Sequence, residues 1–338
     1  MNLSTDFDVV PFLAKDGFPL NFWRYQHSSR SKSPVILVHG AGVRANLFNA
    51  PNPTNLINAL ASEGYDVWLL NWRASIDVPY NDWTLDMVAK NDHPAAVQKV
   101  CELTGHKKIK AIIHCQGSTS FMISAVTGLI PEVEVIVSNA VSLFPTVPWF
   151  SVFKLNVMVP MLRPFARFLD AQWGKEAPTF VAKMLDMMVR VFHHENDTQV
   201  GKFVSLLYGS GFPALWQLEN LSQETKQWIA DEFGKISLQF FSNIKACVNA
   251  GVLKPFGQNK ITYTDESPKT NARFVFFAGQ LNKCFTPKGQ IKAFEYFDKI
   301  TPNKHKLHLL PTYGHLDVFF GKNAHIDVFP TMIAALEH

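Results

Sequence analysis

Short runs that are apolar on both faces alternate with helix-like segments over much of this chain. Strands of a parallel sheet covered by helices on both sides have this composition, because neither face of such a strand meets water. The alternation predicts an α/β fold with a mostly parallel sheet flanked by helices. The runs predicted as strands are Phe7–Leu13, Leu20–Tyr25, Pro34–Val38, Asp66–Leu70, Ile109–Ile113, Val133–Val137, Phe274–Phe277 and Leu307–Leu310.

The alternation stops between residues 143 and 260, where no strand is predicted and large apolar residues recur at helical spacing. We therefore expect a core made of residues 1–142 and 261–338, interrupted by a helical cap over residues 143–260. A cap of this composition would bury an acyl or sterol-like group. Docking of Phe144, Trp149 and Phe150 on a membrane surface is an alternative that the apolar residues leave open.

Charge and cysteine content exclude several classes of protein. The chain has 32 Lys+Arg against 28 Asp+Glu and no basic block, so we expect no nucleic-acid partner. The four cysteines include no CxxC pair, so we expect neither a disulfide scaffold nor a finger-type zinc site, and no cofactor. The first residues lack a basic region followed by an apolar one. We therefore expect no signal peptide, and a reduced, cytoplasmic protein.

The segment Ile109–Ser118 carries the strongest chemical signal. A buried strand runs straight into a helix through a tight turn, and Cys115 lies at the turn's apex. A G-x-S-x-G turn presents a nucleophilic serine in this way, but here Cys115 replaces the serine and Ile113 replaces the first glycine. Unpaired N–H groups at a helix N-terminus favour an anion, so we expect a lowered pKa for the Cys115 thiol and a nucleophilic role.

Two further loops follow buried strands and meet the same sheet edge. The sequence His39-Gly40-Ala41-Gly42 follows Pro34–Val38, and a loop in that place supplies one amide of an oxyanion hole. The predicted donors are Ala41, with Gly42 as an alternative, and Gln116. Near the C-terminus, His315 follows the last strand in a glycine-flanked loop, which makes it the predicted general base.

The residue that orients His315 is expected after Phe274–Phe277. That loop contains Asn282 and no acidic residue. An amide holds a catalytic imidazole in some cysteine enzymes, which makes Asn282 the first candidate. Asp317 is the alternative carboxylate, although it lies only two residues from His315.

Together the cysteine turn, the HG loop and the terminal GH loop resemble the α/β-hydrolase fold. More narrowly, the chain resembles the hydrolase domain found C-terminal in cholesterol-oxidase-like proteins of the GMC oxidoreductase group, and more distantly the polyhydroxyalkanoate synthases. The matching stretches are GYDVWLLNWRAS at 64–75, DHPAAV at 92–97, HCQGS at 114–118, GQLNKCFTP at 279–287, GHLD at 314–317 and FGKNA at 320–324. The first resemblance implies an esterase- or lipase-like activity.

These observations support three hypotheses about function. In the first, Cys115 attacks an apolar ester or thioester, His315 moves the proton, and water releases the acyl group. In the second, the acyl group passes to an alcohol or thiol, which makes the protein an acyltransferase. In the third, the fold has lost catalysis and binds a ligand. Asn282 and Ile113 favour the third hypothesis, because both depart from the usual pattern.

Overall fold

The computed structural model describes residues 6–258 and 260–337. A central sheet has the strand order β1-β2-β4-β3-β5-β6-β9-β10. Pairing is antiparallel for β1–β2 and β2–β4 and parallel for all later neighbours, which confirms the predicted, mostly parallel sheet. The strands are β1 (Phe7–Leu13), β2 (Pro19–Tyr25), β3 (Pro34–Val38), β4 (Asp66–Asn71), β5 (Ile109–His114), β6 (Val133–Asn139), β9 (Arg273–Gly279) and β10 (Lys306–Leu310).

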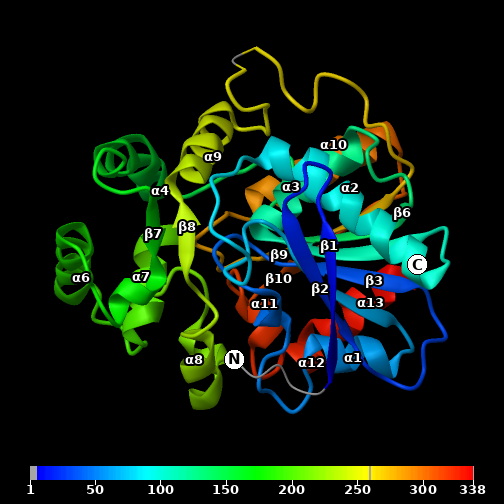
Figure 1. Cartoon of the computed structure of the whole chain (residues 1–338), viewed down its shortest axis with the longest axis horizontal. Coiled ribbons are helices and arrows are strands. Elements are labelled where there is room, and N and C mark those ends of the chain that lie inside the picture. Colours follow the sequence, from blue (N-terminus) through cyan, green and yellow to red (C-terminus); the bar gives the residue numbers. More distant parts are fainter. Residues whose placement is uncertain (1–5, 259, 338) are drawn as a thin grey trace.

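Helices cover both faces of this sheet (Figure 1). Two apolar clusters result, one beneath α2, α3 and α10 and one beneath α1 and α13. No helix of the described residues is long and apolar enough to cross a membrane. The helices are η1 (Ala45–Phe48), α1 (Leu56–Ser62), α2 (Leu85–Thr104), α3 (Cys115–Val126), α10 (Lys288–Ile300), α11 (Asp317–Phe320), α12 (Ala324–Asp327) and α13 (Phe329–Glu337).

Between residues 143 and 260 the chain leaves the sheet and forms a separate group of elements, called the insertion below (Figure 1). The prediction that it contains no strand is wrong, because β7 and β8 pair antiparallel in a small sheet of their own. Three-residue strands are too short to show a period of two. Its elements are α4 (Trp149–Phe153), the π-helical η2 (Lys154–Met158), α5 (Val159–Leu162), β7 (Phe168–Asp170), η3 (Ala171–Gly174), α6 (Phe180–Phe192), α7 (Gln199–Tyr208), η4 (Leu218–Asn220), α8 (Gln223–Ile229), β8 (Lys235–Ser237) and α9 (Leu238–Ala250).

Helix α2 begins earlier than its sequence pattern suggested. The apolar residues Ala96, Val97, Val100 and Leu103 predict a helix over Pro94–Leu103, but Pro94 lies inside α2, whose N-cap is Thr84. The Thr84 side chain accepts a hydrogen bond from the Met87 N–H. The polar residues just before Pro94 hid this first half, because Asp92 is polar and yet fully buried.

A buried ion-pair cluster ties α2 to the sheet and to the β1–β2 hairpin. Arg73, which follows β4, donates to Asp92 of α2 through Nε at 2.7 Å and to Asp16 of the hairpin turn through Nη2 at 2.8 Å. The side chains of Arg73 and Asp92 are 2% and 0% exposed. Their mutual neutralisation is what permits two charges in this position.

We predict that Arg73→Ala destabilises the fold by about 3 kcal/mol, because Asp92 then stays buried without its partner. Urea unfolding followed by circular dichroism measures this change. The matched control is Arg190→Ala, which removes an exposed arginine paired with Asp186 four residues away and is expected to cost no more than about 0.5 kcal/mol. Equal losses in the two variants would contradict the proposed role of the Arg73 cluster.

Candidate active site

Cys115 lies at the sharp turn between β5 and α3, as predicted. Its φ of 54° falls in the left-handed region, which non-glycine residues rarely adopt outside constrained sites. The turn passes so close to the end of β3 that a Cβ on Gly117 would lie 2.2 Å from the His39 carbonyl oxygen. Only glycine at position 117 allows this approach, which brings the loop after β3 against the sulfur.

The two predicted oxyanion donors meet at the Cys115 sulfur. The backbone N–H groups of Ala41 and Gln116 both act on the Cys115 thiol, where they lower its pKa. The alternative donor, Gly42, is already engaged, because its N–H donates to the Ala74 carbonyl at 3.0 Å. Of the two predicted choices in this loop, the geometry therefore favours Ala41.

His315 reaches the same place from the loop after β10. The Cys115 sulfur and one ring nitrogen each of His315 and His114 all lie within 4.8 Å of one another. The rings of His114 and His315 are adjacent, with centroids 4.6 Å apart. The structure thus brings together the predicted nucleophile and the predicted base, which are separated by two hundred residues of sequence.

Asn282 contacts His315, but the amide presents its nitrogen. The Asn282 Nδ2 lies 3.0 Å from the His315 Nδ1. The Asn282 Oδ1 accepts from the backbone N–H groups of Cys284 at 2.9 Å and Phe285 at 3.1 Å. With its oxygen occupied, Asn282 donates to Nδ1, and the neutral ring then carries its proton on Nε2. The amide therefore orients the ring with the opposite hydrogen-bond direction from a triad carboxylate.

Asp317, the alternative partner of His315, is turned to other groups. Its carboxylate accepts from the N–H of Gly314 at 2.8 Å and from the Asn220 side chain at 2.6 Å. Burial raises the pKa of Asp317 to about 6 against these hydrogen bonds, which lower it. The carboxylate thus holds the loop that carries His315 rather than its ring.

Both reactive groups are neutral at pH 7. Burial raises the pKa of the Cys115 thiol to about 12, although the Gln116 and Ala41 amides act to lower it. Burial also lowers the pKa of His315 to about 3. The expectation of a lowered thiol pKa is therefore wrong for this state, because desolvation outweighs the helix N-terminus.

The His114, Cys115 and His315 cluster is the one place in the described residues with ligand spacing for a metal. Metal-bound histidines donate their second ring N–H to a carboxylate or carbonyl. Here Asn282 donates to the Nδ1 of His315, which leaves that nitrogen no proton to give. The donor set therefore does not suit a metal ion at His315.

Two small apolar cavities, of about 60 and 20 Å³, touch Cys115. The larger extends beneath the insertion, among apolar side chains of α5 and α9 such as Val159 and Phe241. Two polar residues in its wall, Lys154 and Tyr208, were not predicted from the sequence. The buried Lys154 Nζ donates to the carbonyls of Leu206 and Gly209 at the end of α7, where a cation is favoured. A lysine inside an otherwise apolar run was the available signal.

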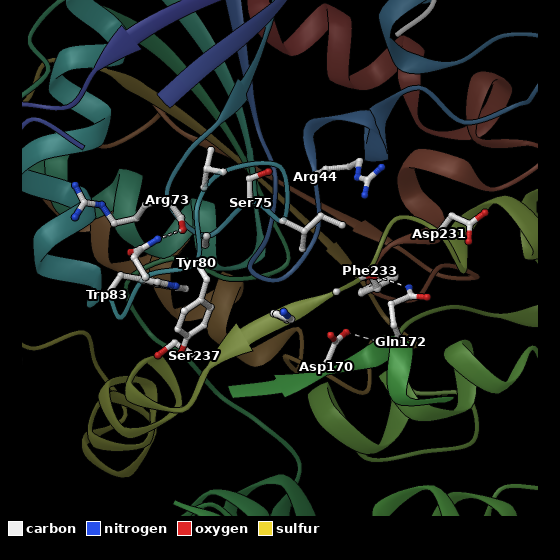
Figure 2. A pocket seen from close by; sticks show the side chains of 16 residues that line it. Arg44, Arg73, Ser75, Tyr80, Trp83, Asp170, Gln172, Asp231, Phe233 and Ser237 are labelled. Carbon is white, nitrogen blue, oxygen red and sulfur yellow. Dashed lines mark hydrogen bonds between the residues drawn. The ribbon is translucent and has the colours of Figure 1, made fainter. Parts of the chain in front are cut away.

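A larger hollow of about 540 Å³ lies between the insertion and the loop after β4, and Cys115 does not line it (Figure 2). Two of its polar side chains are already engaged with other groups of the protein. Gln172 donates to the carbonyls of Ala230 and Phe233, and Ser237 donates to Asp82. Neither Cys115 nor His315 lines this hollow, which lies between two parts of the fold.

Comparisons with known proteins agree with this geometry. Residues 33–123 match the family described as alpha/beta hydrolase fold. The chain is 32% identical to human lipase member K over 365 aligned residues, covering 98% of this chain and 87% of that protein. A match to sterol esterase 2 of Saccharomyces cerevisiae is 23% identical over 51% of this chain, and spans only 36% of that esterase. In structure, a soluble variant of monoglyceride lipase from the same yeast gives a TM-score of 0.61 at 15% identity, over 97% of this chain and 95% of that one.

This chain therefore belongs to the α/β-hydrolase family, and the predicted fold is confirmed. The relatives named above are an esterase and two lipases. The narrower resemblances, to the hydrolase domain of cholesterol-oxidase-like proteins and to polyhydroxyalkanoate synthases, find no support among them.

We predict that Cys115 reacts slowly with iodoacetamide at pH 7 and that its rate rises without a plateau up to pH 10. The raised pKa leaves little thiolate at neutral pH, and the thiolate fraction grows about tenfold for each pH unit below the pKa. Peptide mass spectrometry measures the rate at Cys115, and Cys101, which is half-exposed, is the internal comparison. A plateau for Cys115 below pH 8 would contradict the raised pKa.

Proposed function

We propose that this chain hydrolyses carboxylic esters or thioesters of apolar acids, with Cys115 as the nucleophile. The observation that carries the proposal is the meeting of the Cys115 sulfur, two backbone N–H donors and the His315 ring at one sheet edge. Acyl transfer chemistry needs these three parts, namely a nucleophile, oxyanion stabilisation and a proton carrier. The esterase and lipases among the relatives support the reaction class.

In the acylation step, the sulfur attacks the carbonyl carbon and the thiol proton passes to the His315 Nε2. The carbonyl oxygen becomes an oxyanion, which the N–H groups of Ala41 and Gln116 stabilise. His315 then gives the proton to the leaving alcohol or thiol, and an acyl thioester remains on Cys115. In the second step, His315 takes a proton from water as the water oxygen attacks the thioester carbon. The C–S bond then breaks, and His315 returns the proton to the sulfur, which releases the acid and restores the Cys115 thiol.

The Asn282 amide controls the fraction of His315 rings whose Nε2 is unprotonated and can accept the thiol proton. To accept the thiol proton, Nε2 must be bare, so the ring proton must move to Nδ1 and Asn282 must turn its oxygen toward the ring. That turn gives up the hydrogen bonds from Cys284 and Phe285. Losing two such bonds costs about 1–3 kcal/mol, which keeps the reactive tautomer in a minority. We propose that this equilibrium limits turnover.

The substrate's acyl group is proposed to lie in the apolar cavity beneath the insertion, which would then act as a cap over residues 143–260. The lining of Val159, Leu155 and Phe241 suits a hydrocarbon chain. The cavity of about 60 Å³ is smaller than the ~300–1,000 Å³ of small-molecule sites. Parts of the insertion must therefore move before an acyl chain enters.

A ligand-binding protein without catalysis is the second candidate. The neutral state of Cys115 and His315 and the direction of the Asn282 hydrogen bond favour it. The acyltransferase hypothesis shares the thioester step, and an added alcohol distinguishes it from hydrolysis, because transfer yields a new ester in place of the acid.

We predict that Cys115→Ala lowers hydrolysis of a short-chain p-nitrophenyl ester by about 10³-fold or more, because the covalent route is lost. Intact-mass spectrometry of the wild type during turnover should detect an acyl adduct that maps to Cys115. The matched control is Cys284→Ser, which alters a buried cysteine of the same cavity wall and should retain activity. Wild-type turnover by Cys115→Ala would exclude the proposed nucleophile, and absence of hydrolysis by the wild type would favour the ligand-binding candidate.

We predict that Asn282→Asp raises kcat by about 10–100-fold, the factor that corresponds to the cost of turning the amide. A carboxylate would accept from Cys284, Phe285 and the His315 Nδ1–H together, which fixes the base tautomer and raises the pKa of His315. The pH–rate profile should therefore show a higher apparent pKa for the base. Asn139→Asp is the matched control, because Asn139 makes the same kind of contact with His114 at 2.9 Å. A decrease in kcat for folded Asn282→Asp would show that the amide orientation does not limit turnover.

A further inference from the structure

The helical segment α4–η2–α5 is apolar on two opposite faces, although it lies at the surface. Its inner face contributes Ser151, Leu155 and Val159 to the cavity that contains Cys115. Its outer face carries large apolar side chains at intervals of four residues, a spacing that aligns them along one side of a helix. This outer stripe consists of Trp149, Phe153, Val157 and Met161, followed by Phe165 in the turn after α5; they are 80%, 45%, 39%, 67% and 75% exposed.

A helix that is apolar on both faces is normally buried, so the stripe indicates a surface that something covers. Helix α4, where the stripe begins, lies in the insertion on the side away from the central sheet (Figure 1). The inner face already packs on the protein, because α9 contacts α4 and α5. The outer face is exposed, so burying it requires a partner that is itself apolar.

The charges around the stripe identify that partner. Residues 143–169 and 238–264, which include α4, α5 and α9, contain no Asp or Glu. An open groove of about 900 Å³ between α5 and α9 is lined by Arg163, Lys245 and Lys254, beside apolar residues such as Pro160. Among the described residues, neither Arg163 nor Lys245 forms an ion pair with an acidic side chain. The surface thus combines an apolar stripe with two cations, Arg163 and Lys245, that no acidic side chain of the described residues pairs.

We propose that this face docks on an anionic lipid surface, with the stripe inserted among the acyl chains and the cations of the groove at the lipid phosphates. Helices that lie in a membrane interface have this composition, with Trp and Phe on one face and Lys or Arg beside them. A second copy of the chain is a poorer occupant, because a symmetric contact would place the same cations against one another. Lipid docking would also put the wall of the Cys115 cavity directly against the lipid.

Vesicle binding of the full chain tests the proposal without depending on hydrolysis. The wild type is expected to co-sediment with vesicles of phosphatidylcholine and phosphatidylserine, more weakly with phosphatidylcholine alone, and less as salt increases. The double variant Phe153→Gln/Met161→Gln should bind the mixed vesicles at least about 10-fold more weakly, because each substitution removes an inserted side chain. Neither residue lines the Cys115 cavity, so hydrolysis of a soluble short-chain ester should stay unchanged.

The matched control is Leu13→Gln/Ile326→Gln, which removes two exposed apolar side chains, 64% and 66% exposed, that lie outside the insertion. This variant should bind vesicles like the wild type. A third variant, Arg163→Gln/Lys245→Gln, should lose the preference for phosphatidylserine. Equal binding by the stripe variant and the wild type would overturn the proposal, as would binding with no lipid-charge or salt dependence. A wild-type dimer that binds no vesicles and that the stripe variant dissociates would assign the stripe to a second copy instead.

Discussion

The close approach of the backbones that follow β3 and β5 determines how the groups around Cys115 are arranged. Gly117 lets the first turn of α3 lie against the His39 carbonyl, and Gly40 lets the next loop pass the Cys115 side chain, whose Cβ would be 3.0 Å from a Cβ at position 40. Because the backbones are this close, the amides of Ala41 and Gln116 converge on one atom. The strained φ of Cys115 is stabilised by the same packing. Side chains larger than hydrogen at either glycine would separate the sulfur from its donors.

The parts of the fold that the sequence predicts are those set by the burial of each strand and by the parallel direction of the strands. Strands such as β5 are apolar on both faces, which identifies a covered parallel sheet, and parallel strands deliver their following loops to one edge. The sequence alone therefore predicts that one edge of the sheet carries Cys115, Ala41, Asn282 and His315. The start of α2 and the strands β7 and β8 could not be predicted, because buried Asp92 looks like a surface residue and three-residue strands have no pattern.

The electrostatic state of the site lies beyond what local sequence determines. A helix N-terminus predicts a lowered pKa for Cys115, and the Gln116 and Ala41 amides do act to lower it. Desolvation is larger, and it depends on residues distant in sequence, such as Tyr208 and Phe285, that close over the sulfur. Under the proposed function, a movement of the insertion that admits substrate would also change the solvation of the Cys115 thiol, and with it the pKa.

The sequence position of Asn282 predicts that it orients His315, but in the structure the hydrogen bond runs in the opposite direction from that of a triad carboxylate. An amide offers both an acceptor and a donor, and the sequence gives no reason to prefer one. The backbone N–H groups of Cys284 and Phe285 donate to the Asn282 Oδ1, which leaves only the Asn282 Nδ2 to contact His315. A carboxylate in the same place would accept from all three. The replacement of an acid by Asn282 therefore does more than remove a charge, because it inverts the hydrogen bond on which the basicity of His315 depends.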